Sequence, residues 1–445
     1  MIFRANEIDF KEIKKLPLQS DNFQTVVFIP RLIFLVFIIL IQWYFYQAIH
    51  TITKESVDTK KLILKYSYFI IAGILITGGM ISLFYPFPNW PRTLRLTLGT
   101  FMFIVLLCQL IGVIFLIPDD LIRLFRVMYS KLFFNQQNID SGNKITRLNF
   151  FSQLAFYAAL IPGIGLLYGY LRGGYDYRIH RVKINFDELP EEFIGLKIVQ
   201  ISDIHTGSFI NPAPLLKAFN LINEQKPDVI FFTGDLVNDL AEETEGFEHA
   251  FKILKAPMGI FSVFGNHDYA EYIYPGEANA DLRHIAQEKL KKVHKDFGWK
   301  LLMNEHTYLE KNNKKIGIIG VENWDAKGRF SKYGDLVKAT KNMEETALNI
   351  LLSHSPSHWE AKVLPEFKNI HLTLSGHTHG MQLGIELPGF KWSPVKYLYK
   401  QWAGLYQNND QYLYVNRGLG FIGYNGRLGI WPEITVIELG KNQVS

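Results

Sequence analysis

Four long apolar stretches near the start of the chain set the strongest limit on what it can fold into. None of them contains Asp, Glu, Lys or Arg. Each is about as long as an α-helix must be to cross the hydrocarbon core of a bilayer, roughly 20 residues. The sequence therefore predicts an all-α membrane domain of about four helices over residues 1–176. The predicted spans are Leu32–Ile49, Tyr66–Phe84, Leu96–Ile117 and Leu148–Leu171.

Residues near the ends of these stretches agree with that prediction. Tyr and Trp side chains cluster there, as amphipathic rings do at the headgroup level of a membrane. A cleaved signal peptide predicts a single short apolar core, which four long stretches do not fit. Buried helices of a soluble domain are the other alternative. Gln42 interrupts the first stretch. Prolines mark the edges at Pro30, Pro86, Pro88, Pro91 and Pro118, and Pro162 lies inside the fourth stretch.

Charge and cysteine content narrow the class of protein further. Charged residues make up only 20% of the chain, and the net charge of +5 is spread without a long basic run, so we expect contact with a membrane and not with nucleic acid. The single cysteine, Cys108, excludes an intramolecular disulfide. Four spans put both ends of the membrane domain on one side. Lys and Arg number eleven on that side and nine on the other, which favours slightly a cytoplasmic C-terminal half in a multi-pass protein of the cell (inner) membrane.

After Tyr177 the pattern changes to short β-rich runs that alternate with amphipathic stretches. Near-continuous apolar strands separated by helices predict an α/β domain over residues 177–445, with sheets covered on their outer faces. Tyr412–Val415 and Ile434–Glu438 are expected to complete the second sheet. The other predicted strands are Leu196–Ser202, Asp228–Thr233, Gly259–Phe264, Lys315–Val321, Asn349–Ser353 and His371–Ser375, and the predicted helices are Pro214–Gln225 and Phe247–Leu254.

Polar residues follow five of these strands at the point where each strand ends. Ligand sites in open α/β sheets lie just beyond the carboxyl ends of strands. A lone histidine at such a place is usually structural, but five ends that carry only Asp, Asn and His form a converging set of metal ligands. Glycines before several of them allow a tight turn and close approach. The five sets are Asp203-Ile204-His205, Gly234-Asp235, Gly265-Asn266-His267-Asp268, His354 and Gly376-His377-Thr378-His379-Gly380.

This motif string resembles the calcineurin-like metallophosphoesterase superfamily over roughly Arg181 to Leu439. Asp203 precedes Asp235 by 32 residues, and Asp235 precedes Asn266 by 31, as in that family. The order of elements and the tail around Asn416–Gly420 and Trp431–Ile434 look like its bacterial membrane-associated branch, some members of which have several transmembrane helices. The resemblance implies a four-layer αββα sandwich.

The resemblance also implies a site with two divalent metal ions. Asp203, His205 and His379 would hold the first metal, and Asn266, His354 and His377 the second. Asp235 would bridge the two, which lowers their mutual repulsion. His267 would stay unligated, face the substrate and protonate the leaving oxygen. Since Asp, Asn and His suit Mn, Fe and Zn alike, the metals are not identified. The implied reaction is in-line attack of a metal-bridging hydroxide on phosphorus.

Two positions depart from the family's pattern. The family commonly has Gly-Gly-Gln after the last histidine, whereas this chain has Gly380-Met381-Gln382. In relatives with an Asp–His dyad, an Asp often lies three residues after the bridging Asp. This chain has Asn238 there, and an amide orients His267 but stabilises its charged form less. His358 and His371 match no motif and are interpreted as structural.

The substrate is less defined than the site. Tyr269–Pro275 is expected to overhang the site, and Phe390–Tyr406 is dense in aromatics and Lys, which suits an amphiphile's path, a bilayer contact or a packed rim. Arg417 and Arg427 are candidate phosphate contacts or surface ion pairs. We expect a phosphorylated small-molecule or lipid substrate.

Three functions remain open at this point. One is hydrolysis of a lipid-linked phosphate, with cleavage of UDP-2,3-diacylglucosamine in lipid A synthesis as a specific version. Another is a broad phosphodiesterase or phosphatase that the membrane half merely places. The third is a catalytically idle metal-binding membrane sensor or scaffold, against which the intact motif set argues.

Overall fold

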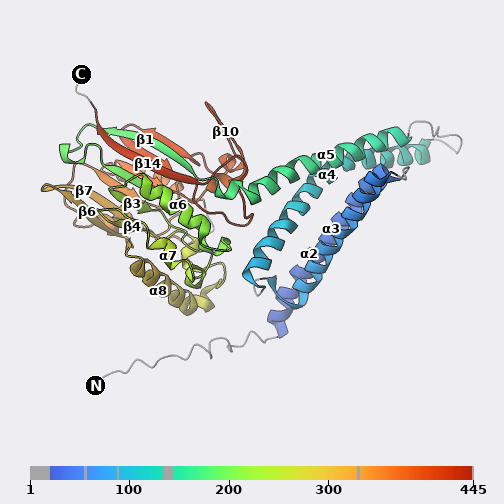
Figure 1. The fold of residues 1–445 in the computed structure, drawn as a ribbon, viewed down its shortest axis with the longest axis horizontal. Helices are drawn as coiled ribbons and strands as arrows, with labels where there is room; N and C mark the ends of the chain where they lie inside the picture. Colours follow the sequence, from blue (N-terminus) through green and yellow to red (C-terminus); the bar gives the residue numbers. More distant parts are fainter. Residues whose placement is uncertain (1–20, 55–57, 88–89, 134–143, 328–330, 443–445) are drawn as a thin grey trace. The chain divides into compact units, whose positions relative to one another are not determined.

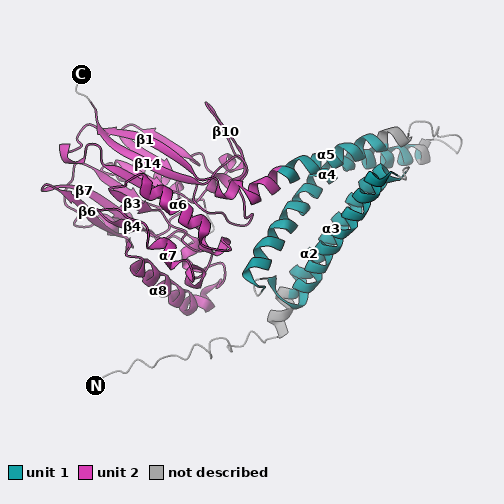
Figure 2. Ribbon diagram, in the orientation of Figure 1, with its two compact units in different colours: residues 1–164 teal, residues 165–445 magenta. Residues whose placement is uncertain are grey.

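A computed structural model describes residues 21–54, 58–87, 90–133, 144–327 and 331–442. The chain divides into two compact units, residues 1–164 and 165–445 (Figure 2). The domain border that the sequence suggests after residue 176 stays a prediction. The last turns of the fourth apolar helix, from Gly165, are counted with the second unit.

The described part of the first unit consists of long helices (Figure 1). Among the described residues, four helices are long and apolar enough to cross a membrane, and each contains one of the predicted spans. The chain is therefore a membrane protein. The helices are α2 (Asp21–Thr53), α3 (Thr59–Phe84), α4 (Arg92–Phe133) and α5 (Lys144–Leu171).

Two of the predicted edge prolines lie inside helices. Pro30 is within α2 and Pro118 is within α4, which continues to Phe133. An apolar stretch and a helix need not end together, since a helix keeps its own backbone hydrogen bonds after its side chains turn polar. Pro162 lies inside α5 as expected. Pro88 is outside the described residues.

The polar residue that interrupts the first span has a partner inside the first unit. The side-chain amides of Gln42 and Gln109 exchange two hydrogen bonds of 2.6 and 2.9 Å, and both residues are buried. This reciprocal pair joins α2 to α4. Buried amides in membrane helices are stabilised by such contacts, because lipid offers them no alternative partner.

Among its described residues, the second unit contains two six-stranded sheets and a separate hairpin. In the first sheet, β1 (Arg178–Phe186), β14 (Glu433–Lys441), β2 (Lys197–Ile201), β3 (Val229–Phe232), β4 (Ile260–Ser262) and β5 (Lys300–Leu301) follow one another in that order. In the second sheet the order is β12 (Gly404–Asn408), β13 (Gln411–Val415), β9 (Leu372–Ser375), β8 (Asn349–Leu352), β7 (Lys314–Gly320) and β6 (Glu305–Lys311). The hairpin consists of β10 (Ile385–Leu387) and β11 (Phe390–Trp392).

One strand assignment from the sequence is wrong. Ile434–Glu438 was expected in the second sheet, but β14 lies in the first sheet between β1 and β2. It runs parallel to β1 and antiparallel to β2. The β1 strand, which the sequence pattern did not single out, supplies the partner that holds β14 there.

Alternating side chains divide the second unit into layers. Along β2, Ile198 points into a core shared with residues of the second sheet, while Val199 points to the opposite face and packs with helix residues. Along β8, Ile350 joins the shared core and Leu351 faces outward. The result is the expected α/β sandwich of four layers. Helices α6 (Ala213–Glu224), α7 (Glu248–Phe251) and α8 (Ala280–Asp296) cover the first sheet, as Figure 1 shows, and α9 (Leu336–Thr340) and α10 (Leu364–Glu366) belong to the second sheet's outer layer.

The end of α5 is built into this second unit. The Arg427 N–H donates to the Gly169 carbonyl over 3.2 Å, and the Tyr424 hydroxyl donates to the Leu166 carbonyl. There is no room for a side chain at this seam, because a Cβ at Gly173 would lie 2.0 Å from the Arg427 carbonyl oxygen. The last turn of the fourth span is thus part of the wall of the α/β domain.

Candidate metal centre

The side chains that follow the strands are turned toward one edge of the sandwich by an unusual backbone. Five of the seven predicted ligands have a positive φ: 49° at Asp203, 49° at His205, 61° at Asp235, 71° at His377 and 50° at His379. Few non-glycine residues adopt this left-handed region, which costs of order 1 kcal/mol each and is concentrated at functional sites. The surrounding sheets must hold these turns in place.

Glycines let the turns approach one another. A Cβ at Gly265 would lie 2.2 Å from Oδ1 of Asp235, and one at Gly376 would lie 2.2 Å from Oδ2 of Asp203. Gly234 also has φ of 96°, which favours glycine. The two carboxylates therefore sit directly against backbone that no other residue type could supply.

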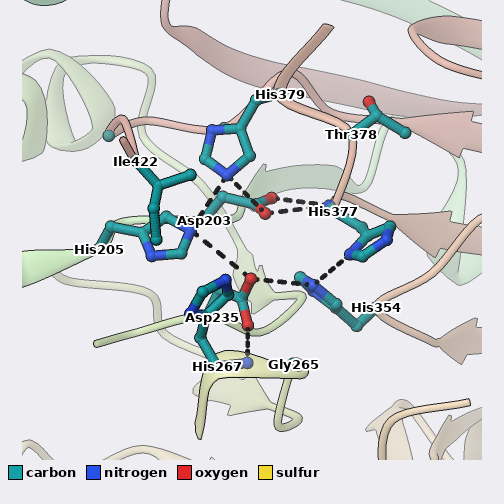
Figure 3. Close-up of polar contacts among 12 residues, drawn as sticks. Asp203, His205, Asp235, Gly265, His267, His354, His377, Thr378, His379 and Ile422 are labelled. Carbon is teal, nitrogen blue, oxygen red and sulfur yellow. Dashed lines mark hydrogen bonds and ion pairs between the residues drawn. The ribbon is translucent and has the colours of Figure 1, made fainter. Parts of the chain in front are cut away.

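Asp203, His205 and His379 form one compact cluster (Figure 3). The Nε2 atoms of His205 and His379 lie 3.0 Å apart, and Nε2 of His379 lies 3.2 Å from Oδ1 of Asp203. All three residues are buried. Their ligand atoms converge on a common centre from two different sheets.

A second cluster shares Asp203 with the first and also includes Asp235 and His354. Oδ2 of Asp235 lies 3.1 Å from Nε2 of His354 and 3.5 Å from Nε2 of His205. Nδ1 of His377 lies 3.3 Å from Nε2 of His354 (Figure 3). One oxygen of Asp235 thus faces a histidine from each cluster.

These separations fit cation binding. Two ligand atoms that each lie about 2.0–2.2 Å from a metal, in directions at right angles, are about 3 Å from each other. The converging atoms of this site are 3.0–3.5 Å apart, which matches that spacing. Asn266 gives an independent sign. Its Oδ1 atom is buried and meets no hydrogen-bond donor among the described residues. A buried amide oxygen normally has a partner, and a cation would serve as one.

The charge states suit metal binding as well. Burial by itself raises the pKa of Asp235, but the neighbouring His354 and His267 lower it well below its usual range. His379 likewise outweighs burial and lowers the pKa of Asp203. Burial lowers the pKa of the His205 imidazole, which leaves that ring neutral. Ionised carboxylates and neutral imidazoles are the forms that ligate metals.

His354 differs from His205 and His379 in the direction of its pKa shift. Burial lowers the pKa of its imidazole, but the charge on Asp235 outweighs burial and raises this pKa to about 10. The ring would therefore release a proton on binding a cation. Its other nitrogen, Nδ1, is 2.7 Å from the Thr233 carbonyl oxygen in the opposite sheet, which fixes the ring's orientation.

His267, the predicted catalytic histidine, lies beside the clusters, and both its backbone and its ring form hydrogen bonds that fix its position. The His267 N–H donates to Oδ1 of Asp235 over 2.9 Å, and Nδ1 of His267 donates to the Asn238 carbonyl over 2.7 Å. Tyr272, from the segment expected to overhang the site, stacks on the ring at 4.4 Å. The sequence suggested that the side chain of Asn238 orients His267. In the structure the Asn238 carbonyl has this role, and the Asn238 side chain lies with its Oδ1 3.1 Å from Nδ1 of His205.

Asp268 fixes the turn that carries Asp235. Its carboxylate is buried and accepts from the N–H groups of Asp235, Leu236 and Gly265 over 2.8–2.9 Å. The last residue of the third motif therefore acts on the backbone and is not among the converging metal-binding groups.

The sequence missed one carboxylate that supports the site. Asp325 is buried, and its Oδ2 lies 3.3 Å from Nε2 of His377 and accepts from the Tyr399 hydroxyl over 2.8 Å. Ser357 donates to the other oxygen over 2.7 Å. A carboxylate on the far nitrogen of a metal-binding histidine fixes the ring and raises its basicity. Asp325 follows the strand predicted at Lys315–Val321, so its position after a strand end was the available signal.

The two candidate phosphate contacts lie inside the domain. Arg417 is buried between Glu433 and Glu386, with 2.5 Å from its Nη2 to Oε1 of Glu386. Arg427 is fully buried and donates to the carbonyls of Arg417 over 2.8 Å and Gly420 over 2.9 Å. Neither is a surface ion pair. Contact with a substrate phosphate stays a prediction for both.

The structure also locates the aromatic segment and the remaining residues that the sequence singled out. Tyr399 brings the aromatic segment Phe390–Tyr406 to the site, where its hydroxyl lies 2.9 Å from Nε2 of His377. Met381 is half exposed at the rim. His358 bonds to Ser353 and His371 accepts from the Asn349 N–H, so these two histidines are structural as expected.

Comparison with protein families gives two matches that together follow the two halves of the chain. Residues 25–174 match the family described as "Probable Calcineurin-like phosphoesterase, transmembrane domain". Residues 196–381 match the family described as "Calcineurin-like phosphoesterase". The second match spans all five motif sets.

Several curated proteins similar to this chain have names that agree with these family matches. A "Transmembrane protein with metallophosphoesterase domain" of Danio rerio is 29% identical, with 63% of this chain and 62% of that protein aligned, so the chain spans less than two thirds of it. The metallophosphoesterase YkuE of Bacillus subtilis is 31% identical over 63% of this chain and 92% of its own length. The "UDP-2,3-diacylglucosamine pyrophosphatase LpxG" of Chlamydia muridarum is 28% identical over 52% of this chain and 81% of its own length.

The position of Asp325 generates the first prediction. Asp325→Asn keeps the shape of the side chain but removes the charge that faces His377, so we expect metal affinity at one of two sites to fall about 10–100-fold. Metal titration with inductively coupled plasma mass spectrometry measures this. Tyr399→Phe, which leaves the contact between Asp325 and His377 in place, should cause a smaller loss. Unchanged affinity for both metals in Asp325→Asn would show that this carboxylate does not support the site.

Proposed function

Because the chain belongs to the calcineurin-like phosphoesterase family and is a metal-dependent hydrolase of phosphoesters, we propose that it cleaves a lipid-linked phosphate at a site with two divalent metals. In this proposal Asp203, His205 and His379 would hold one metal. Asn266, His354 and His377 would hold the other.

The position of Asp235 supports the dinuclear site more than any other observation. Its Oδ2 atom lies between the two candidate ligand sets, 3.5 Å from Nε2 of His205 and 3.1 Å from Nε2 of His354, where it would bridge two metals. Bound metals of this kind supply a water of lowered pKa and positive charge for the phosphoryl oxygens. Asn266 adds a neutral oxygen, so the site keeps net positive charge for an anionic substrate.

His267 supplies the proton for the leaving oxygen. Because Nδ1 donates to the Asn238 carbonyl, Nε2 is the nitrogen left for the substrate. In its charged form the ring donates from Nε2 to the oxygen that leaves phosphorus. Tyr272 stacks on one face of the ring and so restricts its rotation.

Two observations support a lipid-linked substrate. The same chain carries four apolar helices that can cross a membrane. One relative is named for hydrolysis of an acylated nucleotide sugar, UDP-2,3-diacylglucosamine. That reaction is the second candidate function, and it requires the α/β unit on the cytoplasmic side of the inner membrane, as the Lys and Arg distribution slightly favours. A sensor or scaffold without activity would not need His267 beside a full ligand set.

Asp235→Asn tests the bridging carboxylate. The full-length chain loaded with Mn²⁺ should hydrolyse an aryl phosphoester and lose activity in chelator. Asp235→Asn should lower both metal content and turnover by more than about 100-fold, because even an outer partner of a metal ligand can be worth that much. Asp296→Asn, at an exposed position of α8, is the matched control. Full activity in Asp235→Asn with one metal per chain would contradict the proposal.

His267→Ala separates proton donation from metal binding. We expect both metals to stay bound and turnover to fall about 10²–10⁴-fold, the range of general acid catalysis. The loss should be smaller for a substrate with a good leaving group, such as p-nitrophenyl phosphate. His284→Ala, whose side chain is 73% exposed, serves as the control. Loss of metal in His267→Ala would refute the assigned role.

The lipid substrate has its own test. Full-length protein in nanodiscs should show a higher kcat/KM for an acylated nucleoside diphosphate sugar, including UDP-2,3-diacylglucosamine, than for the same molecule without acyl chains. Hydrolysis of both at the same rate would leave a phosphoesterase whose spans only anchor it.

A further inference from the structure

We propose that one face of the β10–β11 hairpin, made by Ile385, Leu387, Phe390 and Trp392, inserts into the bilayer that the spans cross. We name these four residues the apolar hairpin face. This membrane contact goes beyond the proposed hydrolase activity and does not depend on it.

The strand register places the four side chains together. Ile385 pairs with Trp392 and Leu387 pairs with Phe390. Side chains of directly opposed residues lie on the same face of a sheet, and alternate residues along a strand share that face. Ile385 is 48% exposed, Leu387 61% and Phe390 55%. Trp392 is half-buried, so the face is apolar and is open at three of its four residues.

The opposite face of the hairpin is polar and contacts the domain, with Glu386 half-buried and Lys391 exposed. Glu386 pairs with Lys391 across the strands and forms an ion pair with buried Arg417. Lys391 donates to the Ala403 carbonyl and lies over the Tyr406 ring at 5.0 Å. A hairpin in water turns its apolar face inward and its polar face outward. In this hairpin the ion pair between Glu386 and Arg417 holds the polar face against the domain. The apolar face is therefore the outer one, which suits contact with an apolar medium.

The bilayer is the occupant that the surrounding contacts favour. Leu383, just before the hairpin, forms a β-bridge with Leu428, and the Gly384 N–H donates to the Leu428 carbonyl over 2.9 Å. The Leu428 side chain rests against Gly165 in α5, where a Cβ would lie only 3.0 Å away. Gly165 belongs to the charge-free stretch of the fourth span. The hairpin thus leaves the domain beside the end of a membrane helix.

The residues after the hairpin also include exposed apolar side chains. Tyr397 is 74% exposed and Leu398 56%, and Lys396 lies over the Tyr397 ring at 5.2 Å. Exposed aromatic and aliphatic side chains flanked by lysines suit the boundary between headgroups and acyl chains, with the ammonium groups near anionic lipid.

The inner side of this segment reaches the metal-binding loop. Ser393 donates to the Gly380 carbonyl over 2.7 Å, and Thr378 donates to the Trp402 carbonyl over 2.7 Å. Insertion of the hairpin would therefore hold the loop of His377 and His379 at the membrane surface. For a lipid-linked phosphate, which rests on the proposed function, the phosphate would reach the metals without leaving the bilayer.

Site-specific fluorescence tests the insertion. With Cys108→Ala as background, Phe390→Cys carries an environment-sensitive nitrobenzoxadiazole label in the full-length chain. The protein is placed in nanodiscs of phosphatidylcholine and phosphatidylglycerol, with and without lipids that carry a doxyl quencher. We expect blue-shifted emission and at least about twofold quenching by the doxyl lipids, since the label would lie at the acyl boundary.

Val337→Cys provides the matched control, because Val337 is an apolar residue of α9 that is 71% exposed. Its label should emit as in water and resist quenching. Retained hydrolysis of an aryl phosphoester reports the fold of each labelled protein. The double variant Leu387→Asp with Phe390→Asp should keep that activity while a label at Tyr397→Cys loses its lipid quenching.

Two results would overturn the proposal. One is a label at position 390 that is as water-exposed as the label at position 337. The other is protection of position 390 only in particles that contain two chains, since a second copy would then cover the apolar hairpin face. Both results are independent of whether the chain hydrolyses lipid phosphates.

Discussion

The carboxylate of Asp235 is buried between histidines of two clusters, and the rest of the site is arranged around it. The Oδ1 atom of Asp235 accepts a hydrogen bond from the His267 N–H, and the backbone N–H of Asp235 donates to the Asp268 carboxylate. Burying an ionised carboxylate is costly unless positive charge compensates it. Imidazoles surround Asp235 on several sides, and two cations would complete the compensation. The same charge balance that stabilises this residue makes the site suitable for an anionic phosphate.

The scaffold holds the ligands in strained turns and connects them to the membrane helix. The left-handed backbone at Asp203 and His205 is supported by the loop 417–420, whose Leu419 and Gly420 N–H groups donate to the carbonyls of Ser202 and Asp203. Arg427 binds carbonyls of that same loop, while its own N–H is bonded to Gly169 in α5. The last turn of the fourth span therefore contributes to the support of the candidate metal-binding loops.

Local sequence patterns predicted the spans, most strands and the positions of the five motif sets, because these depend on hydropathy, period and strand ends. They could not predict which sheet β14 joins, since pairing depends on a distant partner, β1. The contacts of Asp325 and Asn238 were missed for a related reason. Each acts on a histidine remote in sequence, His377 and His205, and only the folded chain brings the pairs together. The orientation of the hairpin could not be predicted either, because it depends on the ion pair between Glu386 and Arg417, which are remote in sequence.

Electron paramagnetic resonance of the Mn²⁺-loaded, full-length protein tests the central claim most directly. Two Mn²⁺ ions that share the Asp235 carboxylate would lie about 3.5–4 Å apart and be magnetically coupled. The account predicts a multiline spectrum of a coupled pair at two metals per chain, and its loss when Asp235 is replaced by Asn. A simple six-line spectrum of isolated Mn²⁺ at saturating metal would contradict it, because the two clusters would then not form one dinuclear site.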